Sequence, residues 1–271
     1  MEGFISGLHR SPYQGFSVEF SEHKLYSPGD DLKYLDWKVL ARTERYYVKR
    51  FREETNLKAY LLLDTSRSME FGSGKVTKLQ YGIFLASSLA YLLIKQKDAV
   101  GLVVFDEGMR KYIPPRSTTR HLHYILEELE RVTPGKKTSI SQVFHRLAET
   151  LKRRGLIIVI SDLLDDPEEV IRSIHHFRYR KHEVIIFHIL DPYEIDFPFR
   201  FLAEFMDLET GERIVVNPKA ARREYLRIFD SFVYNYRRSF SDSGVDYVRV
   251  NTKVPLDFFL LSYLKKRSRL G

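Results

Sequence analysis

Short and almost unbroken runs of apolar residues recur along this chain, and segments with helical spacing separate them. The runs cover residues 57–63, 99–105, 156–160 and 184–190, and residues 245–250 predict a last strand. Continuous apolar runs of this length are typical of strands that are buried on both faces of a parallel sheet. Their alternation with helical segments predicts an α/β fold of three layers, in which helices cover both faces of a mostly parallel central sheet.

The segments between these runs place apolar residues on one side of a helix. They predict helices at 79–94, 122–129, 141–153, 219–240 and 256–266, and a further helix that begins near Pro167. Residues 110–113 predict a short edge strand before two prolines. The turn sequence Glu209-Thr210-Gly211-Glu212 lies between two extended segments and predicts a β-hairpin, inserted at about 197–217. We expect one domain over residues 56–271 with this hairpin as an insertion.

The first 55 residues follow a different pattern. They predict a strand at 16–20, a turn at 27–30, a short helix from Asp30 or Asp31 to Leu40, and an extended piece at 46–48. We expect residues 1–55 to form an N-terminal arm that packs on the main domain rather than folding alone, with Trp37 as its anchor.

Composition excludes several classes of protein and of site. The 271 residues include no cysteine, so a disulfide framework, a thiolate metal site and a cysteine nucleophile are excluded. No run reaches the roughly 18 apolar residues of a membrane helix. The N-terminus also lacks the pattern of a signal peptide. We therefore expect a cytoplasmic protein without membrane insertion. The net charge of +8 is scattered along the chain, so nucleic acid is not an expected partner.

Polar side chains follow two of the predicted strands directly. Asp64, Ser66 and Ser68 come after the run at 57–63, and Asp162 comes after the run at 156–160. Because the carboxyl ends of parallel strands meet at one edge of an open sheet, we expect the two aspartates to share a crevice there. The loop before the helix at 141–153 can bring Thr138 to the same edge.

Such a set of oxygen donors suits a hard divalent cation, Mg²⁺ or Mn²⁺. The hydroxyls are neutral donors, and the carboxylates supply charge directly or through bound water. An ion with few direct carboxylate ligands stays electrophilic, so it can accept an acidic group from a partner. This chemistry indicates a binding module and not an enzyme.

At this point the sequence resembles known families. The Asp-x-Ser-x-Ser string, the loop threonine and the strand-ending aspartate resemble the metal-ion-dependent adhesion site of von Willebrand factor A domains. Nearly the whole chain resembles the bacterial domain-of-unknown-function family 58. The segments that carry this second resemblance are 27–32 (Ser-Pro-Gly-Asp-Asp-Leu), 36–38 (Asp-Trp-Lys), 41–42, 48–49, Phe51 and 63–69.

The resemblance implies a fold, a ligand set and partners. The strand order would be 3-2-1-4-5-6, and the metal set would be Asp64, Ser66, Ser68, Thr138 and Asp162. The partners would be a MoxR-type AAA+ ATPase and a client protein, in chaperone-like assembly or activation of other proteins. Three cations depart from the usual pattern, since Arg67, Lys136 and Lys137 stand where glycines are common. We expect these three residues to contact an acidic partner.

Other interpretations stay open for several of these residues. A Mg²⁺-dependent phosphotransferase also places an aspartate after its first strand, but it needs a second aspartate where this chain has Ser66. Nucleic-acid binding is suggested only by the net charge. Thr138 is equally suited to be a helix N-cap. Asp165 and Asp166 precede Pro167, and we interpret them as caps and not as ligands.

Overall fold

The computed structural model describes residues 18–53, 57–135 and 139–270. The chain divides into a large unit, residues 57–270, and a small unit within residues 9–56. The two units are described separately below, and the packing of the N-terminal arm on the main domain stays a prediction.

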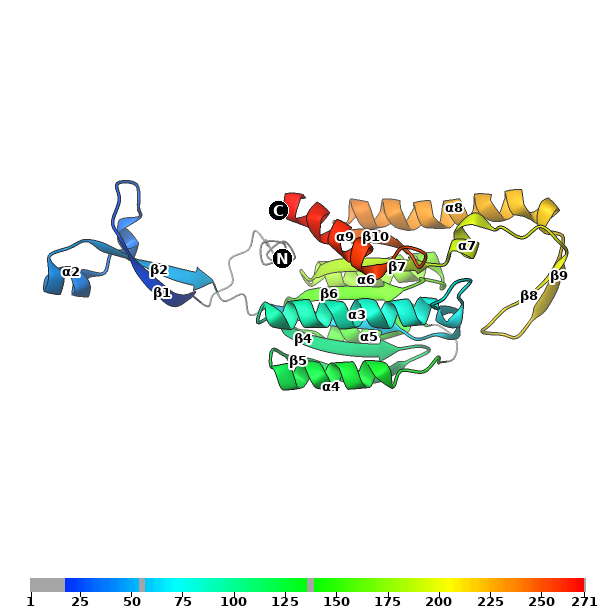
Figure 1. The fold of residues 1–271 in the computed structure, drawn as a ribbon, viewed down its shortest axis with the longest axis horizontal. Coiled ribbons are helices and arrows are strands. Elements are labelled where there is room, and N and C mark those ends of the chain that lie inside the picture. Colours follow the sequence, from blue (N-terminus) through cyan, green and yellow to red (C-terminus); the bar gives the residue numbers. More distant parts are fainter. Residues whose placement is uncertain (1–17, 54–56, 136–138, 271) are drawn as a thin grey trace. The chain divides into compact units, whose positions relative to one another are not determined.

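The large unit is built on a six-stranded sheet whose order is β10-β7-β6-β3-β4-β5. Its strands are β3 (Lys58–Asp64), β4 (Ala99–Phe105), β5 (Met109–Arg116), β6 (Leu156–Ser161), β7 (Glu183–Leu190) and β10 (Asp246–Asn251). All neighbours are parallel except β5, which runs antiparallel to β4 at one edge. When the six strands of this sheet are numbered in chain order from β3, the order is 3-2-1-4-5-6, so the predicted topology is confirmed (Figure 1).

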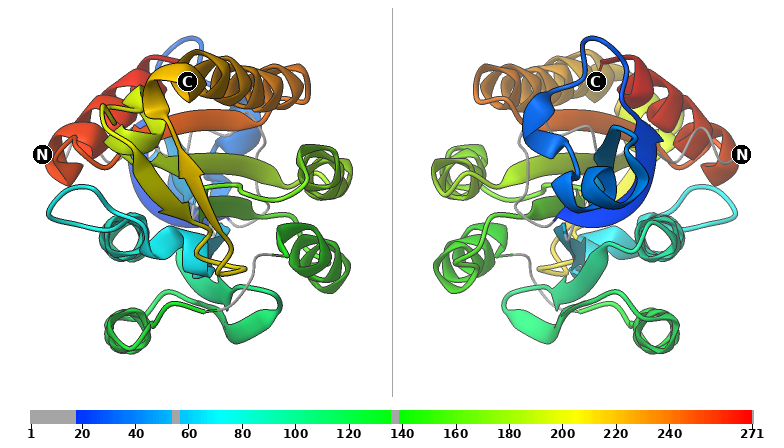
Figure 2. Two further views of the ribbon diagram at one scale, coloured as in Figure 1. Left: turned by 90° about the vertical axis from the view of Figure 1, so that its right-hand side faces the viewer. Right: turned by 90° about the vertical axis from the view of Figure 1, so that its left-hand side faces the viewer.

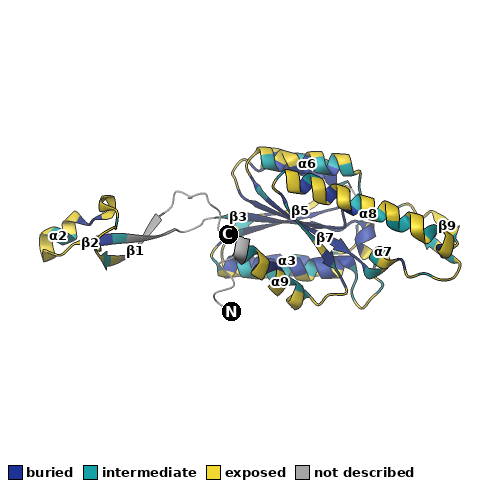
Figure 3. Ribbon diagram, turned by 90° about the horizontal axis from the view of Figure 1, so that it is seen from above, coloured by how far each residue is buried: buried dark blue, intermediate teal, exposed yellow. Residues whose placement is uncertain are grey.

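Helices cover both faces of this sheet (Figure 2). One face carries α3 (Lys78–Lys95), α4 (Thr119–Glu130) and α9 (Leu256–Leu270); the other carries α5 (Ile140–Thr150), α6 (Pro167–Tyr179) and α8 (Pro218–Asp242). Along β3, Leu61 and Leu63 pack into the first core while Tyr60 and Leu62 pack into the second. Figure 3 shows buried strands between helices whose outer sides are exposed. The continuous apolar runs of the sequence follow from this double burial.

The predicted hairpin insertion is also confirmed. β8 (Ala203–Met206) pairs antiparallel with β9 (Arg213–Val216), and the short helix α7 (Pro192–Asp196) precedes the hairpin. Figure 2, left, shows the hairpin across the end of the sheet at which β3 and β6 end. The hairpin therefore lies beside the predicted crevice.

The small unit is a two-stranded sheet with two short helices. β1 (Val18–Leu25) pairs with β2 (Tyr47–Glu53), and the connection holds the 3₁₀ helix η2 (Leu32–Tyr34) and α2 (Trp37–Thr43). The prediction of a single helix up to Leu40 is wrong. Leu35 lies between the two short helices, is extended, and forms a β-bridge with Val48. The strand expected at 16–20 runs from residue 18 to residue 25, and residues 16 and 17 lie outside the described residues. Trp37 is 67% exposed in this unit.

Asp36 holds the small unit together. Its carboxylate caps α2 by accepting from the backbone N–H groups of Lys38 and Val39, and it also pairs with His23 at 2.9 Å and Lys49 at 3.3 Å. The hydrogen bond from His23 is the main cause that lowers the pKa of Asp36 to about 2. Asp36 belongs to the Asp-Trp-Lys segment of the family resemblance, so that segment has a structural explanation.

We expect Asp36→Ala to remove the cap and both ion pairs at once. Hydrogen exchange measured by mass spectrometry should show lost protection in α2 and β2 and unchanged protection in the large unit. Asp31→Ala is the control, because Asp31 is exposed and caps only the three residues of η2. Equal protection of α2 in the wild type and in Asp36→Ala would contradict this role.

Candidate metal centre

The two predicted aspartates come from neighbouring strands. Asp64 ends β3, and Asp162 directly follows β6, which pairs with β3 in parallel so that Leu63 lies beside Ile160. Both aspartates are buried. Burial, with the nearby negative charge of Asp162 as the second cause, raises the pKa of Asp64 to about 7. The expected convergence of the two carboxylates at one edge of the sheet is therefore observed.

The hydroxyls of the Asp-x-Ser-x-Ser segment gather at Asp64. The backbone N–H of Ser66 donates to Asp64 Oδ1 at 2.9 Å, and the hydroxyl of Ser161 donates to Asp64 Oδ2 at 2.6 Å. Ser66 Oγ lies 3.1 Å from Ser68 Oγ, and both side chains are buried. Arg67, between them, is exposed at the start of the 3₁₀ helix η3 (Arg67–Glu70). In this turn the hydroxyls of Ser66 and Ser68 are buried, and the side chain of Arg67 is exposed.

A buried lysine occupies the other side of the crevice. Lys78 Nζ donates to Asp162 Oδ2 at 2.8 Å and to Glu194 Oε1 at 2.6 Å, and Lys78 is fully buried. Burial works against the charged ammonium, but the charges of Asp162 and Glu194 outweigh it and hold the pKa of Lys78 above its usual value. Lys78 and Glu194 were not predicted as residues of the site. Lys78 lies four and seven positions before Gly82 and Leu85, so helical spacing places it on the buried side of α3, and this spacing could have identified it.

His188 fixes the backbone beside Asp162. One ring nitrogen lies 2.9 Å from the carbonyl oxygen of Asp162, and the other lies 2.5 Å from the hydroxyl of Tyr247. Burial lowers the pKa of His188 to about 4, so the ring is neutral at physiological pH. Both ring nitrogens of the imidazole therefore have partners, and the ring supports the end of β6.

The loop that precedes α5 is tied to the same turn. The N–H of Gly135 donates to the carbonyl of Thr65 at 2.6 Å, and a Cβ at position 135 would come within 2.2 Å of Asp106 Oδ2. This close approach requires glycine at position 135. Lys136, Lys137 and Thr138 lie outside the described residues, so their predicted roles stay predictions.

Asp165 and Asp166 are caps, as interpreted from the sequence. Asp166 accepts from the N–H groups at the start of α6, and Asp165 Oδ2 accepts from the N–H of Ile140 at the start of α5. One short loop after β6 thus fixes the first turns of two helices.

The donor set suits a divalent cation in spacing and in charge. Adjacent ligands of an octahedral ion with bonds of about 2.1 Å lie about 3 Å apart, close to the separation of the Ser66 and Ser68 hydroxyls. In the described part of the crevice, the three carboxyl groups of Asp64, Asp162 and Glu194 face a single ammonium, that of Lys78. This excess of acidic groups favours a divalent cation.

The proposed metal ligands are mainly hydroxyl groups and do not form a cluster of acidic side chains. In the described part of the chain, no three His, Cys, Asp or Glu side chains form a group that could hold an ion. Both carboxylate oxygens of Asp162 have protein partners, Lys78 on Oδ2 and the N–H of Leu164 on Oδ1 at 3.3 Å. The partner of Asp162 Oδ2 is a competing cation, whereas the oxygens of Asp64 accept from the uncharged N–H of Ser66 and hydroxyl of Ser161. Asp64, Ser66 and Ser68 would therefore hold the ion, with Asp162 acting through its charge or through bound water.

Comparison with known proteins supplies the family context. A family model described as "Protein of unknown function DUF58" matches residues 22–230. Uncharacterized proteins of Mycobacterium bovis and Mycobacterium tuberculosis are 27% identical over 214 residues, which is 78% of this chain and 67% of each relative.

Two solved structures resemble the fold with a TM-score of 0.53 each. They are the conserved hypothetical protein BatB of Bacteroides thetaiotaomicron, at 16% identity, and an aerotolerance-related membrane protein of Bacteroides fragilis, at 15% identity. Each match covers 79% of this chain, and 99% and 100% of the respective structure. The likeness shows a fold of the von Willebrand factor A type. In the described ranges of the present chain, no helix has the length and apolar character to cross a membrane.

Proposed function

The chain belongs to the DUF58 family of proteins of unknown function, and we propose from its crevice that it is a metal-dependent protein-interaction module and not an enzyme. Asp64, Ser66 and Ser68 bind Mg²⁺ or Mn²⁺, and the ion accepts an acidic group of a partner protein. The single observation that carries this proposal is the buried pair of serine hydroxyls, 3.1 Å apart, beside the buried carboxyl groups of Asp64 and Asp162.

The surroundings of Asp64 support a binding role over phosphotransfer. Hydrogen bonds from Ser66 and Ser161 to its two carboxylate oxygens lower their nucleophilicity, while each oxygen keeps a second lone pair for a metal ion. Ser66 stands where a phosphotransferase of this kind places its acid/base aspartate. The neutral His188 and the lysine-paired Glu194 are held by other groups.

The partners that we propose are a MoxR-type AAA+ ATPase and a client protein that the pair assembles or activates. The family resemblance supports this choice, and so does the charge around the crevice. Arg67 is exposed between the two buried serines, and the whole chain has a net charge of +8. An acidic surface on the partner would be attracted to such a module.

Metal binding is tested with purified protein. Because an ion that binds only the folded state stabilises it, Mg²⁺ at about 100 times its Kd should raise the free energy of unfolding by about 2.7 kcal/mol. Asp64→Asn should abolish this gain, and Glu70→Gln, an exposed change in the same turn, should keep it. A wild-type protein that Mg²⁺ and Mn²⁺ leave unchanged would contradict the metal site.

The partner is tested by co-purification. Capture of the MoxR-type ATPase should need Mg²⁺ or Mn²⁺, should be lost in EDTA and should fail for Asp64→Asn. Capture that persists in EDTA would separate the interaction from the metal. Steady phosphatase turnover that Asp64→Asn abolishes would overturn the binding role in favour of phosphotransfer.

A further inference from the structure

A cavity of about 810 Å³ continues outward from the candidate metal centre. Its inner end is lined by Ser68, Lys78 and Glu194, which are residues of the centre itself. Its outer walls come from α7, α8 and the β8–β9 hairpin. The volume lies within the range of protein cavities that enclose a ligand group. Whatever reaches the metal from this side therefore passes through the cavity.

Aromatic rings form one wall of the cavity, and we call this wall the aromatic chamber: Phe197, Phe199, Phe205 and Tyr225. Phe197 stacks on Tyr225 at 4.4 Å between ring centroids, and Phe199 meets Phe205 edge to face at 4.9 Å. Phe197 has φ +44° because it is the left-handed C-cap of α7, and its N–H donates to the carbonyl of Tyr193. The end of α7 thus fixes the ring of Phe197 in this wall.

The hairpin presents an apolar face to the same space. Phe205 pairs with Ile214, and both side chains line the cavity. Their neighbours in the adjacent pair, Glu204 and Val215, belong to the opposite face, because side chains alternate along a strand. Ile214 is 63% exposed although it lines a cavity. A large part of this apolar wall is therefore uncovered.

The hairpin also offers unpaired strand edges. β8 and β9 form a sheet of only two strands within the described residues. Such a pair is marginally stable by itself and leaves backbone N–H and C=O groups available for a further strand. Strand addition to an exposed edge is a common mode of peptide recognition, in which alternate side chains enter pockets. Exposed apolar residues also continue outside the cavity, at Phe201 and Leu202. A small molecule within the cavity would leave them uncovered, whereas an extended segment would reach them.

The charged groups at the two ends of the cavity favour different ligand groups. At the hairpin end, Asp207, Glu209 and Glu212 line it and Arg213 is the one lysine or arginine among the described lining residues there. A basic residue of a ligand is favoured at this end. At the inner end, the hydroxyl of Ser68 and the proposed metal favour a carboxylate. The aromatic chamber lies between the two.

We propose that this cavity binds an extended segment of a partner protein in which a large apolar or aromatic residue lies a few positions from an acidic residue. The acidic side chain reaches the metal at Ser66 and Ser68, the apolar side chain enters the aromatic chamber, and the backbone adds to an edge of the hairpin. The proposal rests on the proposed function, because the acidic residue needs the metal, and it names the partner chemistry that the site recognises.

The experiment uses the full chain and defined probes. Random peptides of about twelve residues, displayed on phage, are selected against the protein in Mg²⁺, and the most enriched sequence is synthesised with a fluorescent label. We expect enriched peptides to combine an acidic residue with a large apolar residue. Ile214→Glu should weaken binding of the synthetic peptide at least tenfold, equivalent to about 1.4 kcal/mol. Val215→Glu, an equally exposed change on the other face of the same strand, should leave it within about twofold.

The outcomes separate this proposal from the metal site. Enrichment of no peptide, or a peptide that binds Ile214→Glu as tightly as Val215→Glu, overturns the cavity as the binding site even if Mg²⁺ still stabilises both variants. Unchanged binding after the acidic residue of the peptide is replaced by its amide overturns the pairing with the metal. Failure of the proposed function is recognised independently, by the absence of Mg²⁺ stabilisation in the wild type.

Discussion

Replacing Lys78 by methionine should lower the free energy of unfolding by about 3–5 kcal/mol, the usual cost of removing one partner from a buried ion pair. Methionine fills a similar volume, so the loss is mainly electrostatic. Asp162 and Glu194, which both accept from Lys78 Nζ, would be left with buried negative charge. The measurement is urea unfolding followed by circular dichroism in EDTA.

Two further variants make the test of Lys78 specific. Lys95→Met, at the exposed C-terminal end of the same helix, should change stability by less than about 0.5 kcal/mol. Adding Asp162→Asn and Glu194→Gln to Lys78→Met should recover part of the loss, because the groups left without a counter-charge are then neutral. A Lys78→Met protein as stable as the wild type would show that the buried ammonium is not needed to balance the crevice.

Lys78 also changes how the predicted metal set is understood. The sequence predicted Asp64 and Asp162 as a shared pair of carboxylates, but the ammonium of Lys78 already neutralises part of the charge on Asp162. The arrangement leaves the hydroxyls of Ser66 and Ser68 as the donors without a competing cation in the described residues. A metal bound there would retain positive charge for an acidic ligand, which is the property that the proposed function needs.

Much of the fold was predictable because the strands are buried on both faces. In a continuous apolar run such as 156–160, the side chains on both faces of the strand are apolar. This pattern is typical of a parallel sheet that helices cover on both faces. The small unit was predicted less well. The helical spacing around Leu35 gave one helix, whereas a bridge to Val48, thirteen positions away in the sequence, keeps Leu35 extended. Local spacing does not contain that tertiary contact.

The candidate site was predictable only where its residues adjoin a strand. Asp64 and Asp162 end strands, and the sheet brings them together. Glu194 lies on a short helix after β7, and its approach to Lys78 joins residues 116 positions apart. The aromatic chamber depends in the same way on the meeting of α7, α8 and the hairpin. The sequence pattern predicted the long helix and the hairpin, but it contains no information on the tertiary contacts by which these elements enclose a cavity.

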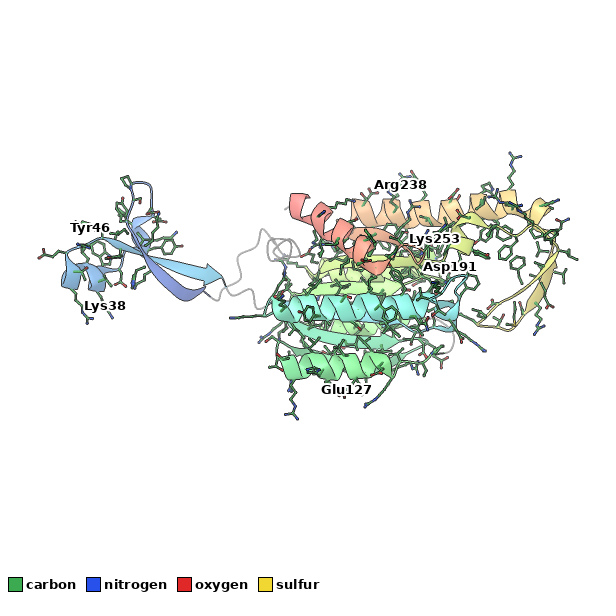
Figure 4. The ribbon with its side chains drawn as sticks, in the orientation of Figure 1. Lys38, Tyr46, Glu127, Asp191, Arg238 and Lys253 are labelled. Carbon is green, nitrogen blue, oxygen red and sulfur yellow. The ribbon has the colours of Figure 1, made fainter. Side chains whose placement is uncertain are left out.

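Asp191 is the second residue whose loss should have a large effect. It directly follows β7 and is fully buried at the end of the sheet (Figure 4). Its carboxylate accepts from the N–H of Ser73 at 2.9 Å, the hydroxyl of Ser73 at 2.5 Å and the N–H of Tyr193 at 2.8 Å. It also accepts from the hydroxyl of Thr252 at 3.4 Å. One side chain thus joins the loop before α3, the start of α7 and the loop after β10.

Asp191→Ala should cost about 3 kcal/mol of unfolding free energy, because it removes the buried carboxylate that accepts from the N–H groups of Ser73 and Tyr193. Asp196→Ala, an exposed change on the same short helix, should be nearly neutral. Asp191→Asn should also be destabilising, because a backbone N–H, which can only donate, faces each carboxylate oxygen, so the amide NH₂ would meet the N–H of Ser73 or of Tyr193. Urea unfolding of the three variants measures these differences, and equal stability of Asp191→Ala and Asp196→Ala would contradict the role of the carboxylate.

The effect of Asp191→Ala should extend to the crevice. The backbone N–H of Asp191 donates to Glu194 Oε2 at 2.8 Å, and Glu194 Oε1 accepts from Lys78, which in turn donates to Asp162. A start of α7 that is loosened at Asp191 would move Glu194 and release Lys78. We therefore expect Mg²⁺ stabilisation to be weaker in Asp191→Ala than in Asp196→Ala when both are measured well below their melting temperatures. Equal Mg²⁺ stabilisation would mean that the strand ends alone position the metal donors, and that α7 serves only the cavity.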